Sequence, residues 1–249
     1  MINIKNLTKS YGNKTVVNNL SFDVPDGLVT GFVGPNGAGK TTTLRCLLSL
    51  IKPDRGTVSI NGKNYEQLEN PLKVVGTLID AKAYHKSRSL YNHLKWVAAS
   101  AGFTNKRVDE VIELTGLQSV RNKNVGTFSL GMAQRVNIAI AMMGQPTHLI
   151  LDEPVNGLDP EGIAWVRQTC RNYAKKGRAV LISSHLLSEL ENTVDRAVVV
   201  GKGQKLAEGT LDQIMKDTGE ISLEKAYFNL TKTAVEFHAS FPSAEGSYE

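Results

Sequence analysis

The segment Gly34-Pro35-Asn36-Gly37-Ala38-Gly39-Lys40-Thr41 decides the fold that we predict for this chain of 249 residues. It matches the pattern G-x-x-x-x-G-K-[ST], in which glycines let backbone N–H groups curl around phosphate oxygens. An apolar run from Leu28 to Val33 precedes it and indicates a strand, and apolar residues at helical spacing from Leu44 to Ile51 follow it. Pro53 ends that helical pattern. A loop between a strand and a helix predicts a triphosphate site, and a glycine-rich turn without a ligand is the alternative.

The residue types in this loop suit a nucleoside triphosphate, and we expect ATP together with Mg²⁺. Lys40 would reach the β- and γ-phosphates, and the Thr41 hydroxyl would bind Mg²⁺. We expect nucleotide contacts from the complete loop and from the residue after it, namely Gly34, Pro35, Asn36, Gly37, Ala38, Gly39, Lys40, Thr41 and Thr42.

A second motif, Leu149-Ile150-Leu151-Asp152-Glu153, places two carboxylates at the end of an apolar strand. Ligands gather at this end of the strands in open α/β sheets. Asp152 would hold Mg²⁺ directly or through water, and Glu153 would polarise the water that attacks the γ-phosphate. Such a pair taken alone is more often a solvated strand end, but the phosphate loop favours the catalytic interpretation.

The order of elements along the chain predicts an α/β fold. The first part alternates as strands do, with Leu20, Phe22 and Val24 on one face, and further strands are predicted at 57–60 and 74–79. Helical patterns dominate from about 81 to 143, which we interpret as an inserted helical lobe.

Strands then return in a βαβ pattern. We predict strands at 148–152 and 179–183 with a helix at 160–174 between them, which is typical of a parallel sheet. A hairpin turn is predicted at 201–203. Residues 218–249 form a short extension, in which Ile221, Leu223, Tyr227 and Leu230 indicate an amphipathic segment and the Ser/Glu-rich end is expected to be partly disordered.

Composition excludes several classes of protein. Cys46 and Cys170 lie far apart without a CxxC spacing, so neither a zinc site nor a disulfide framework is predicted. The sequence has no apolar run of about 18 residues and no signal-peptide layout at its start, so we expect a cytosolic chain. A formal net charge of +5 suits an anionic partner, but the lysines are scattered as on an ordinary solvated surface.

The segment Phe128-Ser129-Leu130-Gly131-Met132-Ala133-Gln134-Arg135 resembles the signature motif of ATP-binding-cassette (ABC) ATPases, commonly LSGGQ. Ser129 and Gly131 match that motif, whereas Leu130 and Met132 depart from it. Ser129 can also cap the helix that follows, and a capped helix end can receive an anionic phosphate. Capping alone is the alternative reading.

Further motifs follow in the order that this family has. Asn156-Gly157-Leu158-Asp159-Pro160 resembles the D-loop, although Asp159 before a proline is also an ordinary helix start. Ser183-Ser184-His185 resembles the switch-histidine loop, in which His185 would hydrogen-bond the γ-phosphate; a structural histidine is the alternative. Tyr11 matches the aromatic residue that stacks on adenine, with an ordinary surface or core tyrosine as its alternative.

The resemblance implies a P-loop NTPase core with a mostly parallel sheet, an N-terminal antiparallel β subdomain and an inserted helical subdomain. It implies one ABC ATPase domain at 1–217, with the helical subdomain at about 81–143. In this family two cassettes stack head to tail, so that ATP on the phosphate loop of one meets Ser129 and Gly131 of the other. The resemblance therefore implies a homodimer that hydrolyses ATP under a separate membrane permease, on the cytoplasmic face of the membrane and without a nucleic-acid partner.

One position departs from the family. Where the family usually has glutamine, at the end of the strand predicted at 74–79, this chain has Asp80. An acidic residue there, with the Ser-Leu-Gly-Met signature, resembles the ATPases of bacitracin- and lantibiotic-type peptide exporters. Asp80 could bind Mg²⁺, or it could be a solvated loop aspartate. The following lobe, with Tyr84, Tyr91 and Trp96, would carry the groove for the permease, although core packing is equally compatible with these aromatic residues.

Two other functions compete with transport. A soluble ABC ATPase acting on ribosomes or nucleic acid would resemble proteins with two cassettes in one chain, a long coiled coil or zinc-binding cysteines, and this sequence has none of these. A nucleotide-binding regulator would bind ATP without hydrolysing it. Among transporters, the short stretch after the last predicted hairpin favours export over sugar-type import. That the exported substrates are antimicrobial peptides or drugs is implied only by the resemblance at Asp80.

Overall fold

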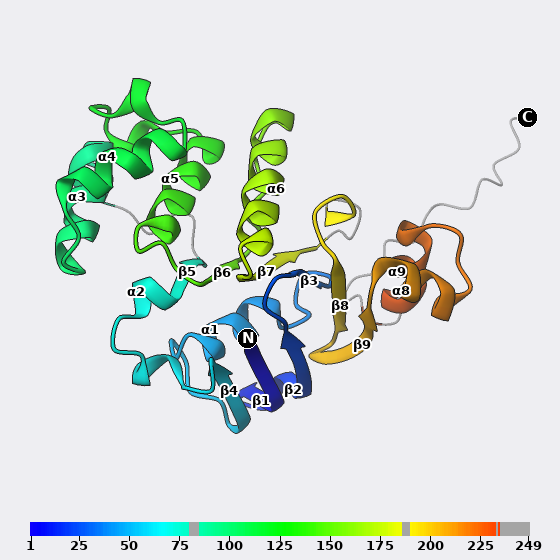
Figure 1. The fold of residues 1–249 in the computed structure, drawn as a ribbon. Helices are drawn as coiled ribbons and strands as arrows, with labels where there is room; N and C mark the ends of the chain where they lie inside the picture. Colours follow the sequence, from blue (N-terminus) through cyan, green and yellow to red (C-terminus); the bar gives the residue numbers. More distant parts are fainter. Residues whose placement is uncertain (80–84, 186–189, 233, 235–249) are drawn as a thin grey trace, which may run out of the picture.

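The structure is a computed structural model that describes residues 1–79, 85–185, 190–232 and 234 (Figure 1). Its first sheet is antiparallel, with the strand order β2-β1-β4. Its second sheet has six strands in the order β5-β6-β7-β3-β8-β9, parallel except for the last. The predicted α/β fold, with a mostly parallel sheet and a separate antiparallel sheet, is confirmed.

The strands have the following bounds: β1 Ile2–Tyr11, β2 Lys14–Val24, β3 Val29–Val33, β4 Arg55–Ile60, β5 Val75–Leu78, β6 His148–Leu151, β7 Ala179–Ser184, β8 Arg196–Gly201 and β9 Gln204–Gly209. The helices are α1 Lys40–Leu47, α2 Pro71–Val74, α3 Leu90–Ser100, α4 Asn105–Leu114, α5 Leu130–Met142, α6 Pro160–Lys175, α8 Leu211–Thr218 and α9 Leu223–Thr231. Short 3₁₀ turns lie at Tyr65–Gln67, Gln118–Val120 and Val125–Thr127.

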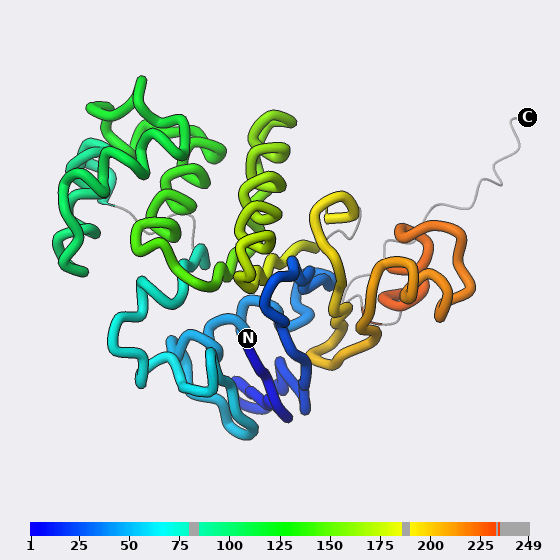
Figure 2. Tube along the Cα trace, viewed as in Figure 1, coloured from blue at the N-terminus to red at the C-terminus, as the bar shows by residue number. Residues whose placement is uncertain are grey.

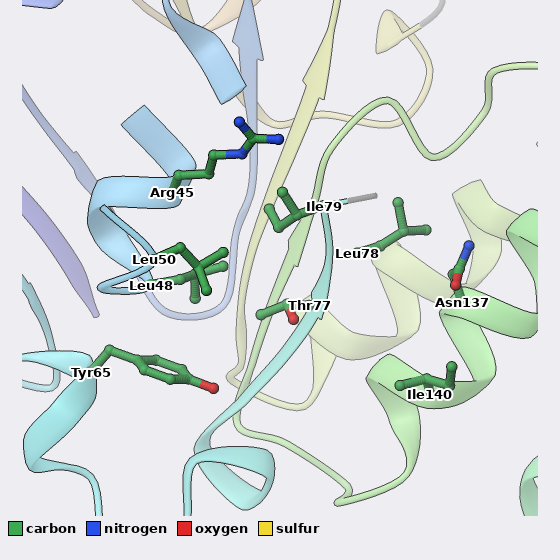
Figure 3. A pocket seen from close by; sticks show the side chains of 9 residues that line it. All are labelled: Arg45, Leu48, Leu50, Tyr65, Thr77, Leu78, Ile79, Asn137 and Ile140. Carbon is green, nitrogen blue, oxygen red and sulfur yellow. The ribbon is translucent and has the colours of Figure 1, made fainter. Parts of the chain in front are cut away.

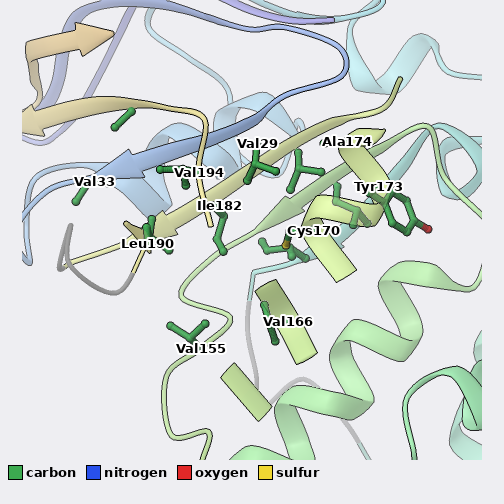
Figure 4. Close-up of a cluster of buried hydrophobic side chains, with 14 of the residues drawn as sticks. Val29, Val33, Val155, Val166, Cys170, Tyr173, Ala174, Ile182, Leu190 and Val194 are labelled. Atoms are coloured by element: carbon green, nitrogen blue, oxygen red, sulfur yellow. The ribbon is translucent and has the colours of Figure 1, made fainter. Parts of the chain in front are cut away.

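The central strands of the parallel sheet, β3, β6 and β7, are buried along their whole length because both of their faces are covered. Side chains on a strand alternate between faces. Leu149 and Leu151 of β6 therefore pack toward α6 and the C-terminal helices, whereas Ile150 packs toward α1 and the antiparallel sheet. Figure 4 shows the first of these layers, in which Val166 and Cys170 of α6 lie against the sheet. A sheet buried on both faces exposes only its ends, where the strands turn into loops.

The inserted helical lobe consists of α3, α4 and α5, which share a core of their own (Figures 1 and 2). Helix α5 also belongs to the main core, because Ile138, Ala141 and Met142 pack against the parallel sheet. The three helices begin at residues whose side chains accept a hydrogen bond from the first turn, namely Ser89, Thr104 and Ser129. Helix α5 therefore links the lobe directly to the sheet that carries the phosphate loop.

The prediction that the first helix extends to Ile51 is wrong, since α1 ends at Leu47. Ser49 adopts a left-handed φ of 55°, and the Leu50 amide donates to the Arg45 carbonyl at 2.9 Å. This tight ending satisfies a carbonyl of the last turn and redirects the chain toward Pro53. Leu50 therefore lies outside the helix and is 62% exposed.

The C-terminal helices α8 and α9 lie beside β8 and β9, on the side of the molecule opposite the helical lobe (Figure 1). Leu223 and Ala226 are buried in the main core, and Tyr227 and Leu230 pack against it. The amphipathic segment that the sequence indicates is thus helix α9, but Ile221 precedes the helix and is 87% exposed. Within the described residues, none of the helices combines the length and the apolar character needed to cross a bilayer.

Candidate functional site

The phosphate loop connects β3, which is buried along its whole length, to helix α1. Two positions of the loop require glycine because a neighbouring backbone segment lies too close for a side chain. A Cβ on Gly34 would lie 2.3 Å from the Val200 carbonyl oxygen, and one on Gly39, whose φ is 95°, would lie 2.6 Å from the Val16 carbonyl oxygen. Only glycine accommodates such contacts, and its backbone freedom gives the loop its tight path into the helix.

A cavity of about 230 Å³ opens against this loop. It is lined by Val16, Asn36, Gly37, Ala38, Gly39, Lys40, Thr41, Thr42 and Glu153. Helix α1 begins at its wall, so that the positive end of the helix dipole faces the cavity. The structure therefore gathers most of the predicted loop residues, and one carboxylate of the acidic pair, around a single hollow suited to an anion.

Lys40 is the cation of this cavity and is only 6% exposed. Its Nζ donates to the Gly34 carbonyl at 2.6 Å and lies 3.5 Å from Glu153 Oε1. Burial lowers the pKa of Lys40, and the negative charges of Glu153 and Asp152 oppose that shift. A buried ammonium at the wall of this cavity is well placed to meet an incoming phosphate charge.

Thr41 and Asp152 form an all-oxygen pair beside the loop. Thr41 Oγ1 donates to Asp152 Oδ2 at 2.7 Å, and Ser183 Oγ donates to Asp152 Oδ1. Burial raises the pKa of Asp152, whereas the hydrogen bonds from Ser183 and Thr41 lower it. Oxygen donors of this type fit Mg²⁺, which takes one or two protein ligands and completes its shell with phosphate and water. The described part of the chain contains no group of three or more His, Cys, Asp or Glu residues placed to hold a metal.

Glu153 is held in a strained backbone conformation, with a φ of 49°. Such a conformation costs free energy for a residue with a side chain and persists only where its surroundings enforce it. Two hydrogen bonds do so here. The Glu153 amide donates to Ser183 Oγ at 3.0 Å, and the Glu153 carbonyl accepts from Gln134 Nε2 at 3.1 Å. The carboxylate is thereby aimed at the cavity.

His185 completes the group, at the end of strand β7. Its Nδ1 lies 2.9 Å from Glu153 Oε2, within hydrogen-bonding distance. Its backbone carbonyl accepts a hydrogen bond of 2.8 Å from the hydroxyl of Tyr227, which belongs to helix α9. The preceding residue, Ser184, accepts a hydrogen bond from the Gly34 amide at 3.3 Å, so the switch segment and the phosphate loop are adjacent.

The signature and D-loop segments contact one another rather than the cavity. Ser129 Oγ accepts from the Met132 amide at 3.3 Å and caps α5, as the sequence allows. A Cβ on Gly131 would lie 3.1 Å from the Gly157 carbonyl oxygen, which shows how closely the two segments pack. Asp159 Oδ1 accepts from the Gly162 amide at 2.8 Å and caps α6. Ser129, Gly131 and Asp159 are not among the residues that line the phosphate cavity.

Tyr11 is a predicted site residue that takes no part in the contacts described above. Tyr11 ends strand β1 and is 49% exposed, and the same β1–β2 hairpin continues to Val16 at the cavity wall. Its ring is therefore accessible to a flat ligand, with Lys9 Nζ lying 5.6 Å from the ring centroid. Asp80, the predicted metal ligand, and Tyr84 lie outside the described residues.

Ser183, Gln134 and Tyr227 join this site, although the sequence assigned none of them a role in it. Ser183 offered a signal, because a polar residue at the end of one parallel strand meets the end of its neighbour. Gln134 stands in the segment that resembles the signature motif, but its contact with Glu153 depends on how α5 packs. Tyr227 is 42 residues from His185, and nothing local in its sequence indicates the contact.

Comparison with known proteins agrees with this geometry. Residues 17–156 match the family described as ABC transporter. The chain is 41% identical over 219 residues to the bacitracin transport ATP-binding protein BcrA of Bacillus licheniformis, covering 87% of this chain and 72% of that protein. It is 35% identical over 229 residues to the lantibiotic transport ATP-binding protein SrtF of Streptococcus pyogenes, covering 92% of this chain and 96% of that protein.

Solved structures show the same fold. The ATP-binding subunit of an ABC transporter superposes with a TM-score of 0.83 at 29% identity, covering 93% of this chain and 99% of that one. A dimeric ATP-binding cassette in a post-hydrolysis state, bound to ADP and Pi, superposes with a TM-score of 0.75 at 22% identity, covering 84% of this chain and 98% of that one.

Proposed function

The chain belongs to the ABC transporter family of ATP-binding subunits, and from that membership we propose how its residues bind ATP, hydrolyse it and pass the result to a membrane permease. It is an ATPase, and subunits of this family work as dimers together with a permease. One observation carries the proposal: Lys40, the Thr41–Asp152 pair and the Glu153–His185 pair meet at one end of the parallel sheet. The soluble alternative, acting on ribosomes or nucleic acid, is not favoured, because the relatives are named transport proteins.

In the proposed mechanism the phosphate loop binds the triphosphate through its backbone N–H groups, and Lys40 neutralises charge on the β- and γ-phosphates. Mg²⁺, held by Thr41 and Asp152, would supply charge neutralisation at the phosphates. Asp80 stays a candidate further ligand on the sequence alone, and Asp80→Asn is the variant that tests it. Tyr11 would stack on the adenine.

Hydrolysis requires a base and a group that senses the γ-phosphate, and we assign these roles to Glu153 and His185. Water attacks the γ-phosphorus as its proton passes to the Glu153 carboxylate, and the bond to the β-phosphate breaks so that ADP leaves with the electron pair. His185 orients the carboxylate through Nδ1 and has Nε2 left to contact the γ-phosphate. The Glu153 carboxylate and the His185 imidazole are adjacent, so the group that accepts the proton and the group that contacts the γ-phosphate act side by side.

We further propose a homodimer in which two chains stack head to tail. Ser129 and Gly131 stand at the N-terminus of α5, where the helix dipole favours an anion. Because they do not line the phosphate cavity of their own chain, the γ-phosphate that they would meet belongs to the other chain. Asp159, next to the packed signature segment, would lie at the same interface.

The permease is proposed to dock where the helical lobe meets the nucleotide-binding core. A cleft of about 350 Å³ lies there, between the end of α1, strand β5 and helix α5 (Figure 3). Its lining is mostly apolar and comprises Arg45, Leu48, Leu50, Tyr65, Thr77, Leu78, Ile79, Asn137 and Ile140. Among the described residues the lining reaches Ile79, and the size of the cleft and the exposed Leu50 suit a short amphipathic helix.

Two of the aromatic residues predicted for this role, Tyr91 and Trp96, lie on α3. Tyr91 stacks under Arg121, whose guanidinium carbon is 3.9 Å from the ring centroid, and Trp96 is 57% exposed beside Arg88. Both rings have an arginine partner within the lobe. Trp96 remains a candidate contact for the permease because it is exposed, whereas Tyr91 is half-buried.

The substrate class rests on the relatives alone. Since the chain resembles bacitracin and lantibiotic transport subunits, we propose export of antimicrobial peptides, with the ATPase on the cytoplasmic face of the membrane and no nucleic-acid partner. The test is to purify the chain with its permease and to measure Mg²⁺-dependent ATP hydrolysis. We expect hydrolysis that the permease stimulates, and cells that lose peptide resistance when Glu153 is changed to Gln. Stimulation by ribosomes or DNA instead of the permease would contradict the proposal.

A further inference from the structure

Helix α9 reaches the catalytic group through one side chain. The Tyr227 hydroxyl donates to the backbone carbonyl of His185 at 2.8 Å, across a separation of 42 residues. The hydrolytic steps described above make no use of this contact. The Tyr227 hydroxyl thus contacts the backbone of His185, the residue whose side chain faces Glu153.

Packing of helix α9 against the main core fixes the position of Tyr227. Leu223 and Ala226, on the same helix, are buried in the main core, and the half-buried Tyr227 ring packs against that core. Burial raises the pKa of Tyr227 to about 12, with a further contribution from the negative charge of Glu153. The phenol therefore stays protonated at neutral pH and remains a hydrogen-bond donor.

His185 directly follows the last residue of strand β7, so its carbonyl is no longer part of the hydrogen-bond ladder of the sheet. The preceding Ser184 carbonyl still accepts from the Gly34 amide, but the His185 carbonyl accepts from Tyr227. The orientation of that peptide group sets the direction in which the imidazole leaves the backbone. A shift of the ring would move Nδ1 away from Glu153 Oε2, which now lies at 2.9 Å.

We propose that Tyr227 is a positioning residue for hydrolysis: its hydroxyl holds the His185 backbone so that the imidazole faces Glu153. This inference rests on the proposed function of His185. Helix α9 is then a functional part of the ATPase, because a displacement of α9 would break the hydrogen bond from Tyr227 and change the orientation of His185. Tyr227 itself is not among the residues that line the phosphate cavity.

The test uses the full 249-residue chain and the variant Tyr227→Phe, which removes only the hydroxyl. We expect kcat for ATP to fall about fivefold, the effect of one lost hydrogen bond, with KM and the Kd for ATP within about twofold of wild type. Tyr173→Phe is the matched control, since Tyr173 packs in the same core and faces Arg178 rather than His185. It should keep the wild-type kcat, and thermal melting should show both variants folded.

A double-mutant cycle with His185→Ala separates positioning from general stability. In the His185→Ala background, single-turnover rates should not fall further when Tyr227→Phe is added. An unchanged kcat in Tyr227→Phe, or the same loss in both backgrounds, would overturn the inference while leaving the role of His185 intact. A His185→Ala variant with wild-type turnover would instead overturn the proposed role of His185, and this inference with it.

Discussion

His185 Nδ1 lies 2.9 Å from Glu153 Oε2, although the two residues are 32 positions apart in the chain. The contact exists because β6 and β7 are adjacent parallel strands, with Leu151 paired to Ile182, so that both residues emerge at the same sheet edge. Glu153 is turned toward the histidine by its left-handed φ of 49°. The proximity of the base and its orienting group therefore depends on the order of the strands and on the strained backbone of Glu153.

Glu153→Gln should keep ATP binding and lower steady-state turnover by about tenfold or more, the low end of the effect of a lost general base. Glutamine preserves the size of the side chain and removes its capacity to accept a proton. The matched control is Glu161→Gln, an exposed carboxylate in the first turn of α6, which should hydrolyse ATP at the wild-type rate. Equal rates for Glu153→Gln and wild type would disprove the base assignment.

Thr41→Val should raise the Mg²⁺ concentration needed for half-maximal hydrolysis by about tenfold, because it removes one hydroxyl ligand at constant shape. Thr41→Ser keeps the hydroxyl that lies 2.7 Å from Asp152 Oδ2 and should restore the wild-type response. Titration of ATPase activity with MgCl₂ at fixed ATP measures both. If Thr41→Val and Thr41→Ser respond alike, the hydroxyl is not a ligand.

Ser129→Asp should abolish ATP-driven dimer formation without unfolding α5. Aspartate caps a helix as well as serine does, so the bond to the Met132 amide can be kept, but its charge repels a phosphate brought by the second chain. Ser129→Asn caps equally well without that charge and should still dimerise. Light scattering with Mg²⁺ and ATP in the Glu153→Gln background distinguishes the two, and dimers of Ser129→Asp would contradict the head-to-tail arrangement.

We expect the free energy of unfolding to fall in mild acid because of His148. It is buried in β6 with Nε2 2.9 Å from Asn61 Oδ1, and burial, aided by the Met1 ammonium, lowers its pKa from 6.5 to about 4. Because the unfolded chain binds the proton more tightly, stability falls as the pH drops from about 6.5 to about 4, by about 3 kcal/mol for the full shift.

The measurement is the free energy of unfolding in urea at pH 7 and pH 5, for wild type and for His148→Gln. Glutamine keeps a polar group near Asn61 but does not titrate, so its stability should depend less on pH. An equally steep loss in both proteins would assign the acid sensitivity to other groups.

Local patterns in the sequence identify the elements of the site well. The glycine loop between strand and helix, the carboxylates after an apolar strand and the capping Ser129 and Asp159 all depend on residues a few positions apart. The end of α1 is an instructive exception. The apolar spacing continues to Ile51, but the left-handed Ser49 stops the helix at Leu47, because backbone hydrogen bonding there outweighs the pattern.

The sequence by itself determined which residues could bind phosphate, hold a cation or act as a base, since these capacities are properties of residue types at short spacing. Only the tertiary structure decided which of them meet. The order β5-β6-β7-β3-β8-β9 brings Ser183 to Asp152, packing of α5 brings Gln134 to Glu153, and docking of α9 brings Tyr227 to His185. Contacts across such separations depend on how buried faces pack together, which no local stretch of sequence encodes.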